Sequence, residues 1–191
     1  MDQLVWSVIE QLEQLDERAD LPEPLYRISQ ENGLFLNLLV RMSKATRVLE
    51  IGSSSGYSGL FLAEAARANG GTVTTCELSP FKIELANQSY QRAGLQDVIQ
   101  LIPGDAKQTV ANLFGTFDFV FIDAWKDDYP EYLQAVWSHV AVGGVVTADD
   151  IVSQMKQPGI QRYLQLARSL PGASSVTVPI DDGVELTYKL N

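Results

Sequence analysis

The feature that most constrains this chain is an alternation of short apolar runs with longer segments of helical periodicity. The runs are rich in β-branched and aromatic residues and occupy residues 47–52, 71–78, 98–104, 117–124 and 143–150. Helical spacing fills the segments between them, at 57–69, 80–93, about 106–114 and 129–140. Such alternation is typical of a parallel sheet with helices on both of its faces.

The beginning of the chain departs from this pattern. Apolar residues recur at helical spacing over 2–17 and about 28–43, and the stretch LPEP closes the first of these segments. Two helices are therefore expected before the first strand. With 191 residues and no linker, the chain is expected to form a single domain over 1–191. That domain divides into a helical N-terminal cap at 1–45 and a core at 46–191.

The end of the chain also departs from the alternation. After a helix at about 157–169, the runs SVTVPI and GVELTYKL flank Asp181-Asp182-Gly183. An Asp-Gly turn between two such runs is a β-hairpin signal. The last strand is therefore expected to run antiparallel to the rest.

Composition limits the partners and the location of the protein. The net charge of −10 disfavours nucleic acid, because an acidic chain repels phosphate backbones. The lone cysteine, Cys76, excludes an intramolecular disulfide, which fits a reducing cytoplasm. No run approaches the length of a membrane span, and the N-terminus is acidic from Asp2 onward, unlike a signal peptide. We expect a cytoplasmic protein without membrane or nucleic-acid partners.

The stretch EIGSSSGYSG, residues 50–59, joins the first predicted strand to the next helix. One interpretation is the G-x-S-x-G elbow of a serine hydrolase, and the order Ser54, Asp123, His139 matches that class. However, the sequence predicts that His139 lies inside a helix among apolar neighbours. The loop also follows the first strand of the sheet, whereas a hydrolase elbow follows several. The hydrolase interpretation is therefore disfavoured.

A second interpretation is a dinucleotide-binding loop. The glycine spacing here is G-x-x-x-G-x-x-G, which is not the G-x-G-x-x-G fingerprint, and no G-K-[ST] follows. Glu50, just ahead of the glycines, would repel a pyrophosphate. The same carboxylate suits a ligand that carries positive charge.

A nucleoside with a cationic tail fits this loop better, and S-adenosylmethionine is such a ligand. Gly52 and Gly56 permit close approach of the backbone. Ser58, at the predicted helix start, is placed to donate to the ligand carboxylate. Glu77, at the end of the second predicted strand, is placed to hold ribose hydroxyls.

With these residues in view, the chain resembles the small S-adenosylmethionine-dependent O-methyltransferases, which include catechol and caffeoyl-CoA O-methyltransferases. The resemblance covers about residues 25 to 190. It rests on motifs in the family's order: RVLEIGSSSGYSGLFLAEA, TTCELSP, PGDA, FDFVFIDAWKDDYPEYL, GGVVTADDIV and VPIDDGVELTYK. It implies a Rossmann-like class I methyltransferase fold, with a seven-stranded, mostly parallel sheet and an antiparallel last strand. It also implies that the N-terminal helices cover the cofactor or form the contact of a homodimer.

The resemblance implies roles for individual residues. The cofactor-binding positions are Glu50, Gly52, Ser53, Ser54, Gly56, Ser58, Glu77, Leu78, Asp105, Ala106, Asp123 and Trp125. Among these, Glu50, Gly52, Gly56 and Ser58 would surround the methionine part, and Glu77 would hold the ribose. Asp105 and Ala106 would lie along the adenine edge, with Trp125 near the ring. Asp123, Asp149 and Asp150 would bind a divalent metal, and Lys126 and Asp123 would be catalytic.

The chemistry of methyl transfer agrees with these positions. A hydroxyl acceptor must become an oxyanion, and a divalent cation lowers its pKa. Lys126, if neutral, would take the proton; if charged, it would stabilise the oxyanion. Three carboxylates without histidine or thiolate favour Mg²⁺, Ca²⁺ or Mn²⁺. The expected acceptor is a hydroxyl on a small molecule of phenolic, catechol-like kind.

Two departures from the family leave alternatives open. The family usually has Asn where this chain has Asp150, and the stretch after it, residues 151–164, is shorter than in the plant enzymes. Asp149 and Asp150 are also compatible with plain turn and cap residues. The alternatives are a methyltransferase that needs no metal and a cofactor-binding protein that has lost catalysis.

Overall fold

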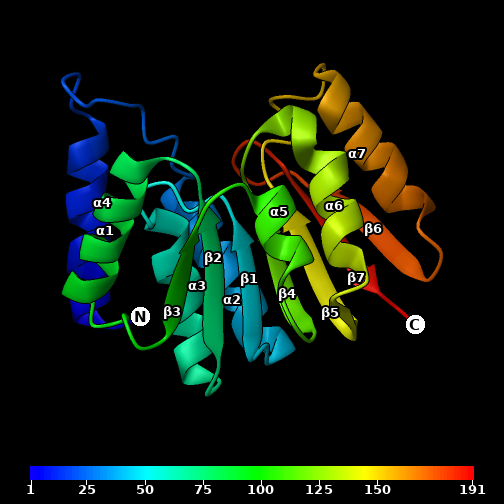
Figure 1. The fold of residues 1–191 in the computed structure, drawn as a ribbon, viewed down its shortest axis with the longest axis horizontal. Helices are drawn as coiled ribbons and strands as arrows, with labels where there is room; N and C mark the ends of the chain where they lie inside the picture. The colour runs from blue at the N-terminus through cyan, green and yellow to red at the C-terminus, as the bar shows by residue number, and fades with distance from the viewer.

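The computed structural model describes residues 1–191 and contains one seven-stranded sheet in the order β3-β2-β1-β4-β5-β7-β6 (Figure 1). The strands are β1 Arg47–Ile51, β2 Thr72–Glu77, β3 Ile99–Pro103, β4 Phe117–Ile122, β5 Val140–Ala148, β6 Ala173–Val178 and β7 Val184–Lys189. All neighbouring strands pair in parallel except β7, which is antiparallel to both β5 and β6. The predicted mostly parallel sheet with an antiparallel last strand is confirmed.

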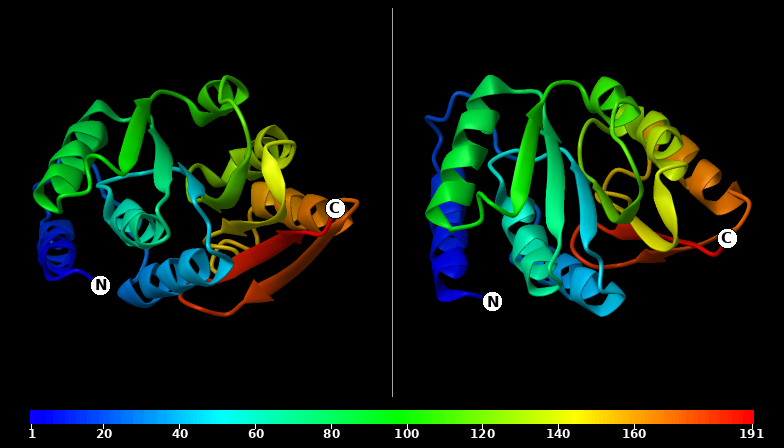
Figure 2. Two further views of the ribbon diagram at one scale, coloured as in Figure 1. Left: turned by 90° about the horizontal axis from the view of Figure 1, so that it is seen from below. Right: turned by 60° about the horizontal axis from the view of Figure 1, so that its bottom comes forward.

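Helices cover both faces of this sheet (Figure 2). They are α1 Gln3–Asp16, α2 Gln30–Ser43, α3 Tyr57–Ala68, α4 Pro80–Arg92, α5 Ala106–Ala111, α6 Tyr129–Trp137 and α7 Pro158–Ser169, with a 3-10 turn, η1, at Lys126–Asp128. Residues of α1 to α4 share one apolar core with Phe119 and Phe121 of β4. Residues of α5 to α7 share a second core with Val120 and Ile122 of the same strand. The alternation of β4 side chains between the two cores is what a strand buried on both faces requires.

Local signals in the sequence set the helix starts. Ser79 caps α4 by accepting a hydrogen bond from the Lys82 N–H, and Pro80 follows at the first helical position, as predicted. Ser29 caps α2 in the same way, through the N–H of Asn32. None of the helices combines the length and the apolar character that crossing a membrane requires.

The junction between α6 and β5 corrects one prediction. The helix ends at Trp137 and the strand begins at Val140, so His139 lies in the turn between them rather than inside a helix. The backbone N–H of Phe117 donates to the His139 carbonyl, and Phe117 pairs with Val140. Strand pairing therefore takes Val140, the last residue of the predicted helix at 129–140, because a short apolar run does not distinguish helix from strand.

The parallel order of the sheet brings the carboxyl ends of β1, β2, β4 and β5 to one edge. The loops that leave these strands are 52–56, 78–79, 123–125 and 149–157. The strand order reverses direction between β1 and β4, and in open α/β sheets ligands bind at such a point.

Candidate active site

A cavity of about 780 Å³ lies at this edge of the sheet. Most of the predicted site residues line it: Gly52, Ser53, Ser54, Ser58, Glu77, Leu78, Asp105, Ala106, Asp123, Trp125, Lys126 and Asp150. Three do not: Glu50, Gly56 and Asp149. The predicted residues therefore located the cavity. Of the three exceptions, Glu50 and Asp149 have buried side chains, and Gly56 packs against Tyr90.

The two glycines of the loop are required by contacts within the protein. Gly52 has a φ of +96°, and a Cβ there would lie 2.0 Å from the carbonyl oxygen of Asp123. Gly56 has a φ of +85°, and its Cβ would lie 2.8 Å from the ring of Tyr90. Both conformations disfavour any residue with a side chain. The space beside these two glycines is therefore occupied by the protein itself, by the Asp123 carbonyl after β4 and by Tyr90 of α4.

Glu50 lies behind the cavity wall, in the middle of the sheet. It is fully buried, and its two oxygens accept hydrogen bonds from Ser58 Oγ at 2.5 Å and Thr75 Oγ1 at 2.6 Å. Burial raises the pKa of Glu50 to about 7, although both hydroxyl donors work against that rise. Because the Ser58 hydroxyl donates to Glu50, the N–H groups of the first turn of α3 are the donors left for a ligand carboxylate.

Glu77 ties together two loops at the cavity. Its Oε2 accepts from the Ser54 N–H at 2.7 Å, and its Oε1 accepts from the N–H groups of Leu78 and Ser79 at 2.8 and 2.9 Å. The carboxylate is therefore fixed in position at the end of β2. A carboxylate oxygen with one backbone donor still has capacity to accept from a ligand hydroxyl.

The adenine side predicted by the resemblance lies around the start of α5. Asp105 caps this helix by accepting from the Lys107 N–H at 2.9 Å, and Ala106 follows it in the cavity wall. Trp125 also lines the cavity but is 73% exposed. An aromatic ring this exposed at a cavity is free to pack against a planar ligand.

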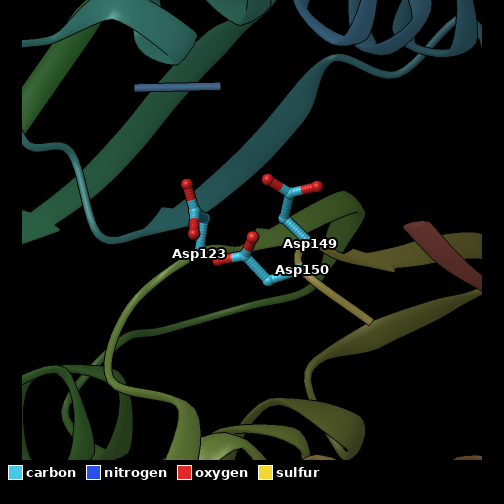
Figure 3. Close-up of side chains that lie close together, drawn as sticks. All are labelled: Asp123, Asp149 and Asp150. Atoms are coloured by element: carbon cyan, nitrogen blue, oxygen red, sulfur yellow. The ribbon is translucent and has the colours of Figure 1, made fainter. Parts of the chain in front are cut away.

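Three carboxylates gather where β4 and β5 end (Figure 3). Asp123 follows β4, and Asp149 and Asp150 follow β5; one oxygen of each lies within 4.8 Å of the others. We call these three residues the acidic cluster. The cluster contains carboxylate oxygens and neither histidine nor cysteine. Its donor chemistry fits a hard divalent cation such as Mg²⁺, Ca²⁺ or Mn²⁺.

Lys126 lies against this cluster. Its Nζ is 2.8 Å from Asp123 Oδ1, 2.6 Å from Asp150 Oδ2 and 2.9 Å from the hydroxyl of Tyr129. Burial on its own lowers the pKa of Lys126, but the carboxylate of Asp123 and its neighbours outweigh burial and hold that pKa above its ordinary value. The structure therefore favours the charged alternative for Lys126, an ammonium able to stabilise an oxyanion.

Asp149 is the buried member of the cluster. It is 3% exposed, and its Oδ1 accepts a hydrogen bond of 2.8 Å from the Asn32 side chain. Burial, with the like charges of Asp123 and Asp150, raises the pKa of Asp149 to about 8. Asn32 lies in the first turn of α2, far away in sequence, and no pattern in the chain points to this contact.

The segment 23–28, between α1 and α2, forms a wall of the cavity that sequence reasoning missed. Glu23, Leu25, Tyr26, Arg27 and Ile28 all line the cavity. The segment is held by hydrogen bonds from Ser54 Oγ to the Leu25 carbonyl and from Ser79 Oγ to Glu23 Oε1. The prolines of LPEP predicted that the first helix ends there, but they did not predict that the following segment lines the cavity.

The geometry excludes the serine hydrolase. Ser54 Oγ donates to the Leu25 carbonyl, at the carboxyl edge of the sheet. His139 lies just before β5, at the opposite edge, and its Nδ1 is 3.1 Å from the Gly115 carbonyl. Consequently, no histidine is available to activate this serine.

Comparisons with known proteins agree with the geometry. The sequence model of a family described as O-methyltransferase matches residues 6–190. The catechol O-methyltransferase of Mycobacterium tuberculosis is 38% identical over 135 residues, covering 70% of this chain and 60% of that protein. The catechol O-methyltransferase of Niastella koreensis is 34% identical, covering 72% and 64%. The chain thus spans less than two thirds of the length of these two relatives.

Solved structures show the same similarity over nearly the whole chain. An O-methyltransferase from Bacillus cereus, solved in complex with SAH, superposes with a TM-score of 0.83 at 29% identity, covering 96% of this chain and 91% of that one. The O-methyltransferase TomG from Streptomyces achromogenes, solved with SAM, gives a TM-score of 0.82 at 27% identity, covering 100% and 91%.

Proposed function

Because this chain belongs to the O-methyltransferase family, we propose that it transfers the methyl group of S-adenosylmethionine to a hydroxyl of a small molecule. The acceptor we propose is phenolic and catechol-like, and a divalent cation at the acidic cluster assists. The observation that carries the proposal is that one cavity is lined both by Glu77 and the loop at 52–54 and by Asp123, Lys126 and Asp150. In-line transfer requires that the methyl donor and the acceptor lie side by side, and a single cavity with both sets of residues meets this requirement.

The cofactor side of the cavity supplies binding and orientation. Glu77 is placed to accept from the ribose hydroxyls, and the N-terminal turn of α3 is placed to hold the carboxylate of the methionine part. Asp105, Ala106 and Trp125 form the wall for the adenine. The segment 23–28 forms a further wall of the same cavity.

The acceptor side supplies the charge that methyl transfer needs. A divalent cation, when bound by Asp123, Asp149 and Asp150, lowers the pKa of an acceptor hydroxyl. The carboxylates of the cluster hold the pKa of Lys126 above its ordinary value, and its Nζ lies beside the cluster, where it would donate a hydrogen bond to the developing oxyanion. The proton released by the acceptor hydroxyl would pass to water, because the carboxylates of the cluster would hold the cation. A homodimer and a cytoplasmic location stay predictions from the sequence.

The first test is calorimetric titration of S-adenosylmethionine and of its demethylated product, with and without Mg²⁺, followed by addition of a catechol. The expected result is that the cofactor binds alone and that the catechol binds only with both cofactor and Mg²⁺. Mass spectrometry then measures methyl transfer to a panel of phenols and catechols.

Two other outcomes point to the alternatives. Methyl transfer that is unaffected by EDTA would identify an enzyme that needs no metal. Cofactor binding without turnover on any hydroxyl acceptor would identify a binding protein. Absence of cofactor binding would contradict the proposal as a whole.

A further inference from the structure

Lys126 is paired with two of the three carboxylates that would hold a metal ion. Its Nζ is paired with Asp123 at 2.8 Å and with Asp150 at 2.6 Å, and both of these side chains belong to the acidic cluster. The Lys126 side chain is only 16% exposed, so water screens little of the attraction. In this structure the cluster already contains a cation, which is the side chain of Lys126.

Asp150 is responsible for the second of these pairs. The family usually has an asparagine at this position, and a neutral amide would offer Lys126 an oxygen without charge. The carboxylate of Asp150 instead makes the shorter of the two ion pairs. Asp150 stands in a left-handed turn with a φ of +63°, and its Oδ1 also accepts from Ser153 Oγ at 3.2 Å.

From these contacts we propose that Lys126 and the divalent cation compete for Asp123 and Asp150, and that cation binding displaces the Lys126 ammonium toward the acceptor. This inference rests on the divalent-cation part of the proposed function and deepens it. Two positive charges on the same carboxylate oxygens repel each other. Lys126 Nζ also lies 2.9 Å from the Tyr129 hydroxyl and 5.0 Å from the centre of that ring, so Tyr129 offers the displaced ammonium a partner outside the cluster.

The competition predicts two positions for the Lys126 ammonium, each with a different role. Without the divalent cation, the ammonium neutralises part of the charge of the cluster. With the cation bound, the ammonium loses both carboxylate partners and becomes a free donor in the cavity wall, where Lys126 already lies. The acceptor oxygen is then contacted by the lysine only when the cation is in place.

The test compares Mg²⁺ affinities measured by calorimetry in the absence of turnover. K126M removes the internal cation with little change in side-chain volume, and we expect it to bind Mg²⁺ at least about tenfold more tightly than the native chain. K126R keeps the charge and is expected to keep the weaker affinity. K107M is the matched control, because Lys107 is paired with Asp128 at 2.8 Å outside the cluster. It removes the same charge and is expected to leave Mg²⁺ affinity unchanged.

Equal or weaker Mg²⁺ binding by K126M than by the native chain would overturn the competition. A second measurement uses the native chain alone and so does not depend on whether a variant folds. The NMR signal of the Lys126 Nζ–H group is followed during Mg²⁺ titration. It is expected to shift while the Lys107 signal stays, and a Lys126 signal unchanged at saturating Mg²⁺ would overturn the inference.

The same samples separate this inference from the proposed function. If neither the native chain nor K126M binds Mg²⁺, yet methyl transfer continues in EDTA, the competition and the divalent cation are both wrong and the methyltransferase stands. If Mg²⁺ binds but S-adenosylmethionine does not, the methyltransferase proposal fails independently of the result at Lys126.

Discussion

At the scale of single residues, three carboxylates near the cavity meet different environments and therefore serve different ends. Glu77 is held by three backbone N–H groups and faces the cavity. Glu50 is fully buried with two hydroxyl donors and does not reach the cavity. Asp149 is buried against the amide of Asn32. Residue type alone does not separate these roles, because each is set by the partners that the fold brings to the carboxylate.

Replacing Glu77 with alanine should weaken both cofactor binding and the loops around it. The change removes the acceptor of three backbone N–H groups as well as the proposed ribose contact. We expect S-adenosylmethionine affinity to fall at least about tenfold and stability by about 1–3 kcal/mol. Calorimetry and urea denaturation measure the two effects. E84A is the control, since Glu84 bonds only Gln88 on the exposed face of α4; unchanged affinity in E77A would refute the ribose role.

The raised pKa of Glu50 predicts how the stability of the folded chain depends on pH. Its pKa is raised to about 7, above the ordinary value of 4.5, so the folded state holds its proton more tightly than the unfolded state. The contribution of Glu50 to stability is therefore complete below about pH 4.5 and is lost as pH rises to about 7. A shift of this size corresponds to about 3 kcal/mol.

The variant E50Q isolates this effect, because glutamine does not titrate and both neighbouring hydroxyls can reorient to it. We expect the native chain to lose stability between pH 5 and 8 more steeply than E50Q in urea denaturation series. Asp149 adds a loss of the same sign in both proteins, since its pKa is raised to about 8. If stability falls with pH equally steeply in the native chain and in E50Q, the pKa of Glu50 is not raised in the folded state.

At the scale of elements, the sequence predicted the strands, the hairpin and most helices, because each follows from local periodicity and turn residues. It missed the end of α6, where pairing with β4 decided between helix and strand. It also missed segment 23–28 and Asn32, whose positions depend on tertiary contacts such as Asn32 to Asp149 across 117 residues of chain. Contacts of this kind leave no periodic signal in the residues that make them.

Segment 23–28 should control how fast the cofactor leaves. Glu23 Oε1 accepts from Ser79 Oγ at 2.8 Å and fixes the beginning of the segment. We expect E23A to speed S-adenosylmethionine dissociation by up to about fivefold, the equivalent of about 1 kcal/mol, as one hydrogen bond is lost. Stopped-flow fluorescence of Trp125 measures the rate. The control is E17A, because Glu17 is exposed at the end of α1, and this change should leave the dissociation rate unchanged. If E23A also dissociates at the native rate, segment 23–28 does not control cofactor release.

At the scale of the whole molecule, the cavity joins two cores that lie on opposite faces of one sheet. Its walls come from loops after β1 and β2, which border the α1–α4 core, and from loops after β4 and β5 beside the α5–α7 core. A ligand that contacts both sets of loops links the stabilities of the two halves. Binding therefore stabilises the domain as one unit rather than locally.

Cofactor binding should accordingly raise the melting temperature in one cooperative transition. At about 100 times its Kd, a ligand that binds only the folded state adds about 2.7 kcal/mol. For a domain of this size, that corresponds to a Tm increase of roughly 5–11 °C. Scanning calorimetry with S-adenosylmethionine or its demethylated product measures the shift. ATP is the control ligand and should give no shift, because its phosphates meet an acidic site; two separate transitions would contradict the coupling.

The bond between the Ser29 N–H and Asp181, at 2.7 Å, joins positions that are 152 residues apart. During synthesis, the segment that forms one wall of the cavity therefore emerges well before the hairpin to which it is bonded. Domains fold as units during synthesis. The nascent chain thus has this wall of the pocket fixed in place only after the hairpin around Asp181 has also been made.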